Sequence, residues 1–392
     1  MITNPGSKIV SAVKFIEAEV KVIEQNSKRD TLMVAGKALI VLLAVLLFLL
    51  SLDIMGNSFL SLRQTAAETI LTVTSNPFVG LFIGLLLTAI IQSSSTSTAM
   101  IVALVGSGAL SLSSAVPIVM GANIGTTLTS TIVSLGFITS KREFRKAISA
   151  GSIHDIYNVI LTIILFPLEY YDQLLSRMSS TMASWLVSLS SDSRAAGPVT
   201  ELEHWSPGAY LTEAVDNTWL LVLLSFVLLF VAIKIMSQII YSSLIGKSKD
   251  HMQDYIFSNP YKSFAWGSVL TAAVQSSSIT TSLMVPLVAT GKVPLQKSFP
   301  FIIGANIGTT VTALIAALFK SEAAISIALV HFLFNSFGVL IFLPYKPLRR
   351  IPGLLAGRFG KLTQRNRLIG FLYIVLMFFL LPFLLIYLNR LT

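Results

Sequence analysis

The chain has 392 residues, of which 54% are hydrophobic and 12% charged, and it carries a formal net charge of +10 and no cysteine. Soluble domains carry about 25% charged residues, so this composition excludes an ordinary soluble domain, and the lack of cysteine excludes disulfides, thiol catalysis and thiolate metal sites. The basic residues gather between long apolar runs, which is typical of membrane topology and argues against a nucleic-acid partner.

Several stretches reach the roughly 20 apolar residues that cross a bilayer as one helix. The clearest lie around 32–52, 218–241 and 368–388. Their long aliphatic runs exclude the alternating strands of a membrane β-barrel. We therefore predict an all-α, polytopic, multi-pass protein of the cell (plasma or inner) membrane.

Composition divides the chain into eight segments. In order, they are a cytoplasmic amphipathic N-terminal arm (1–31), a first span with an outside segment (32–76), repeat 1 (77–168), an extracellular or periplasmic loop (169–216), a connecting span with a cytoplasmic loop (217–259), repeat 2 (260–345), a basic cytoplasmic loop (346–367) and a last span (368–392). The first arm is not expected to be a signal peptide, because lysines interrupt its apolar residues and the span that follows is too long.

Lysine and arginine indicate which segments face the cytoplasm. Basic clusters lie at 8–29, 141–146, 234–262 and 346–367, whereas acidic residues prevail over 169–216, where we expect an amphipathic piece near 178–189. Counting crossings from a cytoplasmic N-terminus predicts a C-terminus outside. Repeat 1 then starts outside and repeat 2 starts inside, which is an inverted-topology repeat, a common construction among secondary transporters.

The two repeats share polar motifs at a constant offset. Gln92-Ser93-Ser94-Ser95 recurs 183 residues later as Gln275-Ser276-Ser277-Ser278, and Gly-Ala-Asn-Ile-Gly-Thr-Thr at 121–127 recurs at 304–310 with the same offset. Apolar helices need no polar clusters, so duplicated ones indicate a site for a solute. Each repeat is predicted to hold a re-entrant helical hairpin with its tip at the first motif, followed by a transmembrane helix broken at the second.

Broken helices expose backbone groups that suit ions. Half-helix N-termini present N–H groups and a partial positive charge to an anion. Carbonyl, amide and hydroxyl oxygens suit Na⁺, and a hydroxyl also donates to an oxyanion. No arginine or lysine lies in the hairpin tips or in the 121–127 and 304–310 motifs, so an anion there would depend on bound cations, which gives a physical reason for coupling.

A simpler interpretation is that small residues only let transmembrane helices pack closely. It accounts for Gly80, Gly84 and four further residues, which are Ser97, Thr98, Ser107 and Ser130. It does not account for glutamine and asparagine at matching places in both copies.

A second polar pattern follows each repeat. His154, Asp155 and Asn158 are echoed by His331 and Asn335, with Phe332 in place of the acid. Residues at i and i+4 share one helix face, so each His–Asn pair is either a functional group or a hydrogen bond between scaffold helices. Asp155 breaks the symmetry and is a candidate for proton or cation traffic.

At these motifs the sequence resembles the type II sodium/phosphate cotransporter family, in particular its bacterial members, over about 76–388. Further shared residues are Glu143-Phe144-Arg145-Lys146, His154-Asp155 and Asn158. The resemblance implies Na⁺-coupled import of inorganic phosphate by alternating access, elevator-like motion included. The substrate-binding residues it implies are Gln92, Ser93, Ser94, Ser95, Gln275, Ser276, Ser277, Ser278, Asn123 and Asn306. The implied sodium ligands are Thr126, Thr127, Thr309, Thr310, Gln92 and Gln275.

The chain departs from animal relatives in its short, cysteine-free outside loop, in an expected missing C-terminal span and in Ala122 and Ala305, where some relatives have a serine in the second copy. We expect phosphate, sodium ions and the lipid bilayer as partners, allow for a homodimer, and expect no cofactor and no catalytic residue. Three other functions stay open. They are a sodium-coupled transporter of another oxyanion or carboxylate, a channel, and an intramembrane hydrolase that would pair a serine with His154 and Asp155; duplicated serines argue against the last.

Overall fold

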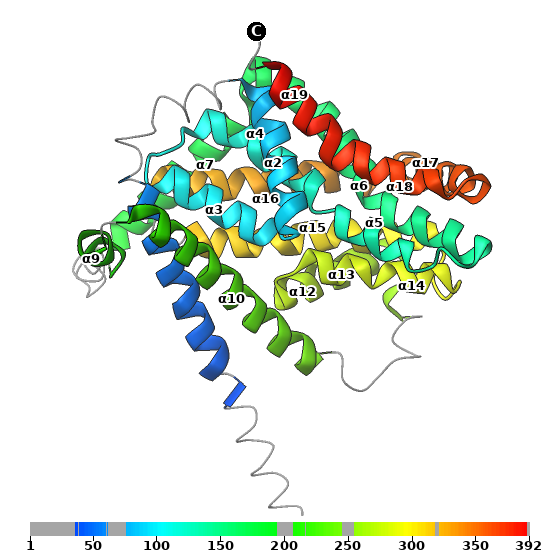
Figure 1. Ribbon diagram of the computed structural model, residues 1–392, viewed down its shortest axis with the longest axis horizontal. Helices are drawn as coiled ribbons and strands as arrows, with labels where there is room; N and C mark the ends of the chain where they lie inside the picture. Colours follow the sequence, from blue (N-terminus) through cyan, green and yellow to red (C-terminus); the bar gives the residue numbers. More distant parts are fainter. Residues whose placement is uncertain are drawn as a thin grey trace, which may run out of the picture.

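The structure is a computed structural model that describes residues 36–37, 39–59, 61, 76–193, 207–215, 217–244, 255–317 and 321–389. Within these ranges every regular element is helical (Figure 1), and seven helices are long and apolar enough to cross a membrane. The prediction of an all-α polytopic membrane protein is therefore confirmed. The predicted amphipathic N-terminal arm (1–31) lies outside the described residues.

The seven candidate spans include one at each of the three clearest apolar stretches in the sequence. They are Leu39–Phe59, Leu112–Leu135 (α4, Leu112–Gly125, and α5, Leu128–Leu135), Lys141–Asp172 (α6), Thr218–Ile235 within α10 (Thr218–Leu244), Leu295–Ala317 (α15), Glu322–Phe342 (α16) and Leu368–Leu388 (α18, Leu368–Val375, η1, Leu376–Leu380, and α19, Leu381–Asn389). Shorter helices complete the chain, namely α2 (Pro77–Ile91), α3 (Ser94–Gly106), α7 (Leu174–Ser193), α9 (Pro207–Ala214), α12 (Pro260–Val274), α13 (Ser277–Ser282), α14 (Met284–Ala289) and α17 (Lys346–Arg365).

Short helices flank both glutamine–serine motifs. The helix α2 has 15 residues, which at 1.5 Å per residue is about 22 Å, less than the roughly 30 Å of a bilayer core. Asn76 and Asn259 cap the starts of α2 and α12 through their side chains, and a proline occupies the first turn of each, a favourable start for a helix. These lengths are those of hairpin arms that enter a membrane without crossing it.

Glycines bring two pairs of helices into backbone contact. The most extensive helix pairings are α2 with α4 and α12 with α15. A methyl group on Gly121 would lie 1.8 Å from the carbonyl oxygen of Leu81, and one on Gly304 would lie 2.1 Å from that of Phe264. Only glycine permits this approach, which is the packing mode of small residues in transmembrane helices. Gly84, predicted to serve packing, does so against Ile118.

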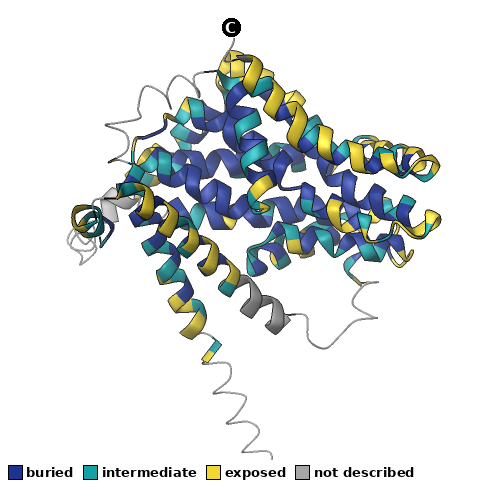
Figure 2. Ribbon diagram, viewed as in Figure 1, coloured by how far each residue is buried: buried dark blue, intermediate teal, exposed yellow. Residues whose placement is uncertain are grey.

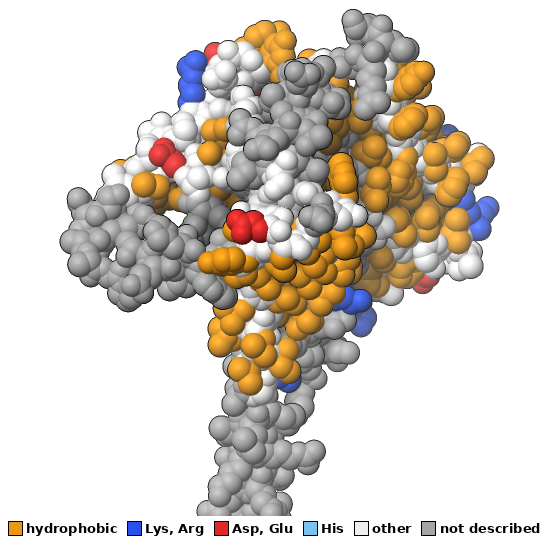
Figure 3. Space-filling view, turned by 60° about the vertical axis from the view of Figure 1, so that its left-hand side comes forward, with side chains coloured by type: hydrophobic (Ala, Val, Ile, Leu, Met, Phe, Trp, Pro, Cys, Tyr) orange, Lys and Arg blue, Asp and Glu red, His pale blue; other side chains and the backbone are white. Residues whose placement is uncertain are grey.

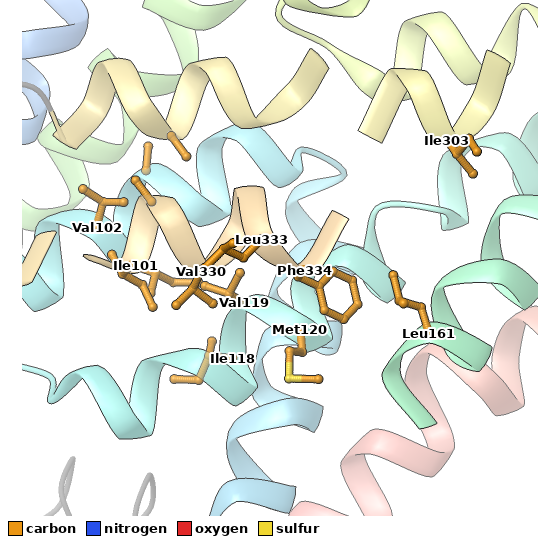
Figure 4. Close-up of a cluster of buried hydrophobic side chains, with 14 of the residues drawn as sticks. Ile101, Val102, Ile118, Val119, Met120, Leu161, Ile303, Val330, Leu333 and Phe334 are labelled. Carbon is orange, nitrogen blue, oxygen red and sulfur yellow. The ribbon is translucent and has the colours of Figure 1, made fainter. Parts of the chain in front are cut away.

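A buried apolar core surrounds these pairs. Figure 4 shows side chains from α3, α4 and α16 converging, and the labelled residues on these helices are Ile101, Val102, Ile118, Val119, Met120, Val330, Leu333 and Phe334. In Figure 2 the buried residues follow α3, α4, α15 and α16 through the centre of the molecule, and exposed ones follow α10 and α19 at its periphery. The polar motifs are thus held inside a closely packed body.

The outer surface is apolar over wide areas. Figure 3 shows a broad hydrophobic face with lysine and arginine at its margins. Exposed apolar side chains on the peripheral helices include Leu42, Leu46, Trp219, Leu223, Phe371 and Leu384. Soluble monomers rarely expose such areas, so these faces suit lipid chains.

Two parts of the prediction need correction. The helix α15 runs without a break through residues 304–310, and the interruption in the first copy is one turn at Thr126 and Thr127, both with right-handed helical backbone. The glycines in these motifs serve close contact with the neighbouring helix and do not redirect the chain. Three of the four predicted interruptions are therefore present, one at each hairpin tip and a single turn between α4 and α5, and the break predicted in the second copy is wrong.

Two segments predicted as loops, one after each repeat, contain helices. The amphipathic piece expected near 178–189 is confirmed as α7, whose start is capped by the buried Glu169 carboxylate, which accepts the N–H groups of Leu175 (2.7 Å) and Ser176 (3.2 Å) and the Ser176 hydroxyl. The segment predicted as a basic loop is the helix α17, because glycine and alanine along one side let it pack on α6.

Candidate functional site

The two hairpin tips have the same backbone geometry. Gln92 and Gln275 end α2 and α12 with left-handed backbone, at φ values of 56° and 54°. Ser93 and Ser276 follow with extended backbone at φ −145° and cap the next helix. Left-handed backbone is unfavourable for residues other than glycine. In the described part of the chain three such residues adopt it, the two tip glutamines and Gln173 at the end of α6.

The tips contact each other through reciprocal hydrogen bonds. Ser95 donates its hydroxyl to the carbonyl oxygen of Gln275 at 3.1 Å, and Ser278 donates to that of Gln92 at 3.2 Å. This exchange of equivalent bonds is the pattern of a two-fold contact. The two glutamine–serine motifs, which are 183 residues apart in sequence, therefore form one structural unit.

Within this unit the first and second serines of each motif have different hydrogen-bond partners. The first serine of each motif accepts an amide N–H from its own helix, with Ser93 bonded to Thr96 at 3.2 Å and Ser276 to Ile279 at 3.3 Å. The second serines face each other across the contact. A capping hydroxyl that accepts an N–H keeps its own hydrogen to donate, so Ser276 retains a donor for a bound anion. The Ser93 hydroxyl also lies 2.9 Å from the Thr96 hydroxyl, and it retains a donor when Thr96 donates in that pair.

Each tip also presents the start of a helix. The first N–H groups of a helix have no partner within it and carry the positive end of its dipole. Helices begin at Ser94 and at Ser277, the second continuing in two pieces to Ala289. No lysine or arginine occurs at 92–106 or 275–291, so N–H and hydroxyl groups supply the attraction for an oxyanion. Gln92 is exposed, whereas Gln275 is half-buried and its side-chain oxygen is buried without a hydrogen-bond partner among the described residues.

The two asparagines predicted to bind substrate lie in a buried network between the halves. Asn306 donates to the side-chain oxygen of Asn158 at 2.9 Å, and Asn335 donates to that of Asn123 at 3.3 Å. Asn158 also donates to the backbone carbonyl of Asn123 at 2.6 Å. Each motif asparagine is thus held by the His–Asn helix of the opposite half.

His154 belongs to the same network. Its Nε2 atom lies 2.6 Å from the side-chain oxygen of Asn306, whose amide group donates to Asn158. Because that oxygen accepts, His154 donates from Nε2. Asp155 is fully buried, and its carboxylate lies 3.3 Å from the Thr127 hydroxyl, which has a shorter bond to the Ile124 carbonyl at 2.8 Å. These bonds favour the interpretation of the His–Asn pairs as hydrogen bonds between scaffold helices. They also argue against an intramembrane hydrolase, because the partner of His154 is the Asn306 amide and a hydrolase would need a serine there.

The predicted sodium ligands differ in how their hydroxyls are used. Thr127 and Thr310 donate to backbone carbonyls three residues earlier, at 2.8 and 2.7 Å. Thr309 donates to the carbonyl of Ala305 at 2.9 Å. The Thr126 oxygen is buried and has no hydrogen-bond partner among the described residues. A donating hydroxyl keeps its lone pairs, so the Thr127, Thr309 and Thr310 oxygens keep the capacity to accept, as does the unpaired Thr126 oxygen.

Sequence reasoning missed Thr88 and Thr271. Both hydroxyls are buried without a partner in the described part of the chain, and each residue's carbonyl accepts the N–H of the tip glutamine at 2.7 Å. The Thr88 Cβ also lies 2.9 Å from where a methyl on Gly125 would be, so it stands between the tip and the second motif. The constant offset of 183 residues, applied to every threonine, would have found this pair. Ser130, predicted as packing, bonds to Thr281 at 2.9 Å and links α5 to α13.

Comparison of the sequence with known protein families identifies one family that matches most of the chain. The model of the Na⁺/Pi-cotransporter family matches residues 47–182 and 216–363, which include both tips, both asparagine motifs and both His–Asn pairs. The chain belongs to this family. No solved structure matches it.

Several characterised proteins are similar to this family member. "Sodium-dependent phosphate transport protein 2A" of Rattus norvegicus is 31% identical over 414 residues, covering 86% of this chain and 65% of the rat protein. The protein of that name from Oryctolagus cuniculus is 30% identical, covering 90% of this chain and 67% of the relative. "Sodium-dependent phosphate transport protein 2B" of Homo sapiens is 27% identical, covering 88% and 64%. The chain thus spans about two thirds of these relatives.

Proposed function

We propose that this protein is a transporter, not an enzyme, that imports inorganic phosphate together with sodium ions by alternating access. The reciprocal contact between the tips carries the proposal, because it brings two helix starts and two glutamine–serine motifs to one place. Family membership and relatives named as sodium-dependent phosphate transport proteins support the choice of ions.

The chemistry of the tips accounts for coupling. Phosphate would accept hydrogen bonds from the Ser276 hydroxyl, from the Ser93 hydroxyl with Thr96 as the donor to it, and from N–H groups at the helix starts. Helix dipoles supply only partial charges, so bound sodium ions would neutralise the rest. Sodium would take oxygens from the tip carbonyls, from the glutamine amides and from threonines such as Thr126 and Thr309. Because each ion improves the site for the other, their affinities are linked.

Inverted topology would give the transporter its two gates. The basic clusters favour a cytoplasmic N-terminus, and seven spans would then place the repeats in opposite senses. Each hairpin would close the site from one side of the membrane, so that phosphate reaches one face at a time. A homodimer is compatible with this arrangement, and light scattering of the purified protein tests it.

Uptake into proteoliposomes tests the proposal. Vesicles containing the purified chain receive labelled phosphate with an inward sodium gradient, and matched vesicles receive a potassium gradient. We expect saturable accumulation with sodium alone. Excess unlabelled phosphate and its close analogue arsenate should compete, whereas sulfate and citrate should not. Stronger competition by sulfate or citrate would assign another anion to the same site, and uptake that is independent of sodium would contradict the proposal.

A further inference from the structure

A basic pocket lies away from the hairpin tips, at the end of the molecule where α6 starts and α14 ends (Figure 1). Its volume is about 360 Å³. Three elements form it, namely the first turns of α6, the turn between α14 and α15, and the second half of α17. The lining residues that matter here are Arg145, Lys146, Ser149, Gly291 and Lys361.

The charge of this pocket is of one sign. Arg145, Lys146 and Lys361 line it, and none of its lining residues is an aspartate or a glutamate. The ammonium group of Lys146 reaches the α14–α15 turn, where it lies 3.0 Å from the position of a methyl on Gly291. Like charges held together repel, and an anion relieves that repulsion. A phosphate group, which accepts several hydrogen bonds from arginine and lysine, fits these donors.

The helix α17 places the pocket at the membrane surface. Its glycines pack on α6, so closely that a methyl on Gly360 would lie 2.5 Å from the carbonyl oxygen of Arg145. Leu354, Leu355 and Leu362 are exposed on the same helix, and so are its basic residues other than the half-buried Arg349. A helix with exposed leucines and basic residues lies in the boundary layer of a bilayer, beside the lipid headgroups. Basic pockets between membrane helices at this depth bind anionic headgroups.

We propose that the pocket between α6, the α14–α15 turn and α17 binds a phosphate-bearing anion, with the headgroup of an anionic phospholipid as its occupant. The site is separate from the hairpin tips and does not depend on the transport proposal. The bound phosphate would join the turn after the second hairpin to α6 and α17, so it would hold that turn in the arrangement seen here.

Binding to the purified full-length chain in an uncharged detergent tests the site. The probes are short-chain phosphatidylglycerol, short-chain phosphatidylcholine and inorganic phosphate, titrated by calorimetry in potassium buffer without sodium, so that sodium-coupled binding at the tips is silent. We expect saturable binding of phosphatidylglycerol and none of phosphatidylcholine, whose choline cation repels the pocket. Inorganic phosphate that displaces phosphatidylglycerol at equal concentration would identify the free ion as the occupant of the same site.

Two triple variants separate the pocket from general surface charge. Arg145→Gln/Lys146→Gln/Lys361→Gln should abolish binding. The control Lys141→Gln/Arg358→Gln/Arg365→Gln removes the same number of basic residues, all three of them exposed and outside the pocket, and should keep binding. Lys361→Gln alone, at an exposed position, leaves folding intact and should weaken binding about fivefold, the effect of one basic residue near an anionic surface. Equal loss in both triple variants, or undiminished binding in the pocket variant, would overturn the proposal.

Discussion

Ser94 and Ser277 face each other with their hydroxyl oxygens 3.4 Å apart, although 183 residues separate them. They are equivalent positions of the two repeats. Equivalent residues meet in this way only on a local two-fold axis, and on either side of them Ser95 and Ser278 exchange hydrogen bonds with the opposite tip. The proposed ion site is built around this contact.

A disulfide tests that contact directly, because the chain has no cysteine of its own. The variant Ser94→Cys/Ser277→Cys should form a disulfide under mild oxidation, since its sulfur atoms replace hydroxyls in direct contact. Mass spectrometry of a proteolytic digest detects the cross-linked peptides. Phosphate uptake should stop on oxidation and recover on reduction.

The control for the cross-link is Ser107→Cys/Ser277→Cys. Ser107 follows the last residue of α3, about 20 Å from Ser94 at 1.5 Å per residue. This pair should stay reduced under the same conditions. Efficient cross-linking of the control, or none of the test pair, would show that the tips do not meet.

Substitution by alanine should lower the stability of the protein at one glycine of the α2–α4 crossing and leave it unchanged at another. In Gly121→Ala the new methyl would lie 1.8 Å from the carbonyl oxygen of Leu81, whereas in Gly80→Ala its nearest neighbour is at 3.4 Å. Overpacking of this kind costs about 3 kcal/mol, so Gly121→Ala should lower the unfolding temperature strongly. Gly80→Ala, at the same crossing, should match the unsubstituted protein. Thermal unfolding in detergent measures both, and equal stability of the two variants would contradict the close crossing.

The asparagine network predicts equivalent effects in the two halves. Asn158→Ala removes the partner of the Asn306 amide, and Asn335→Ala removes the donor to Asn123. A buried polar group that loses its partner costs about 1–3 kcal/mol. Both variants should therefore unfold at lower temperature, with the sodium concentration needed for half-maximal uptake little changed. A changed sodium requirement at full stability would place these asparagines in the ion site instead.

Thr309 should affect sodium more than phosphate. Its hydroxyl donates to Ala305 and keeps its lone pairs for a cation. Thr309→Ala should raise the sodium concentration needed for half-maximal uptake several-fold, while Thr309→Ser, which keeps the hydroxyl, should resemble the unsubstituted protein. Sodium activation curves at fixed phosphate measure this, and an unchanged curve for the alanine variant would make Thr309 structural.

The sequence predicted the elements better than their contacts. Hydropathy located the spans, and the constant offset of the motifs located both tips, because polar residues in apolar helices are visible in the sequence. The continuity of α15 was not predictable, since Gly304 and Gly308 are as compatible with a helix break as with a close crossing. The hydrogen-bond partners of Asn123 and Asn306 also depend on how the two halves pack against each other, and a single amino-acid sequence does not show this packing.

Substitution of the two tip glutamines by glycine separates the role of their side chains in binding from their role in the backbone fold. Gln92 and Gln275 have left-handed backbone, which glycine adopts without strain. The variant Gln92→Gly/Gln275→Gly should therefore keep the hairpins and the stability of the protein to within about 1 kcal/mol, while it removes both amide side chains from the proposed site.

Equilibrium binding of labelled phosphate to this variant and to the unsubstituted protein, each in sodium and in potassium buffer, tests the site most directly. We predict saturable binding by the unsubstituted protein in sodium alone, and none by the glycine variant in either buffer at an unchanged unfolding temperature. Equal phosphate binding by the two proteins, or binding that is the same in sodium and potassium, would contradict a shared phosphate and sodium site at the two tips.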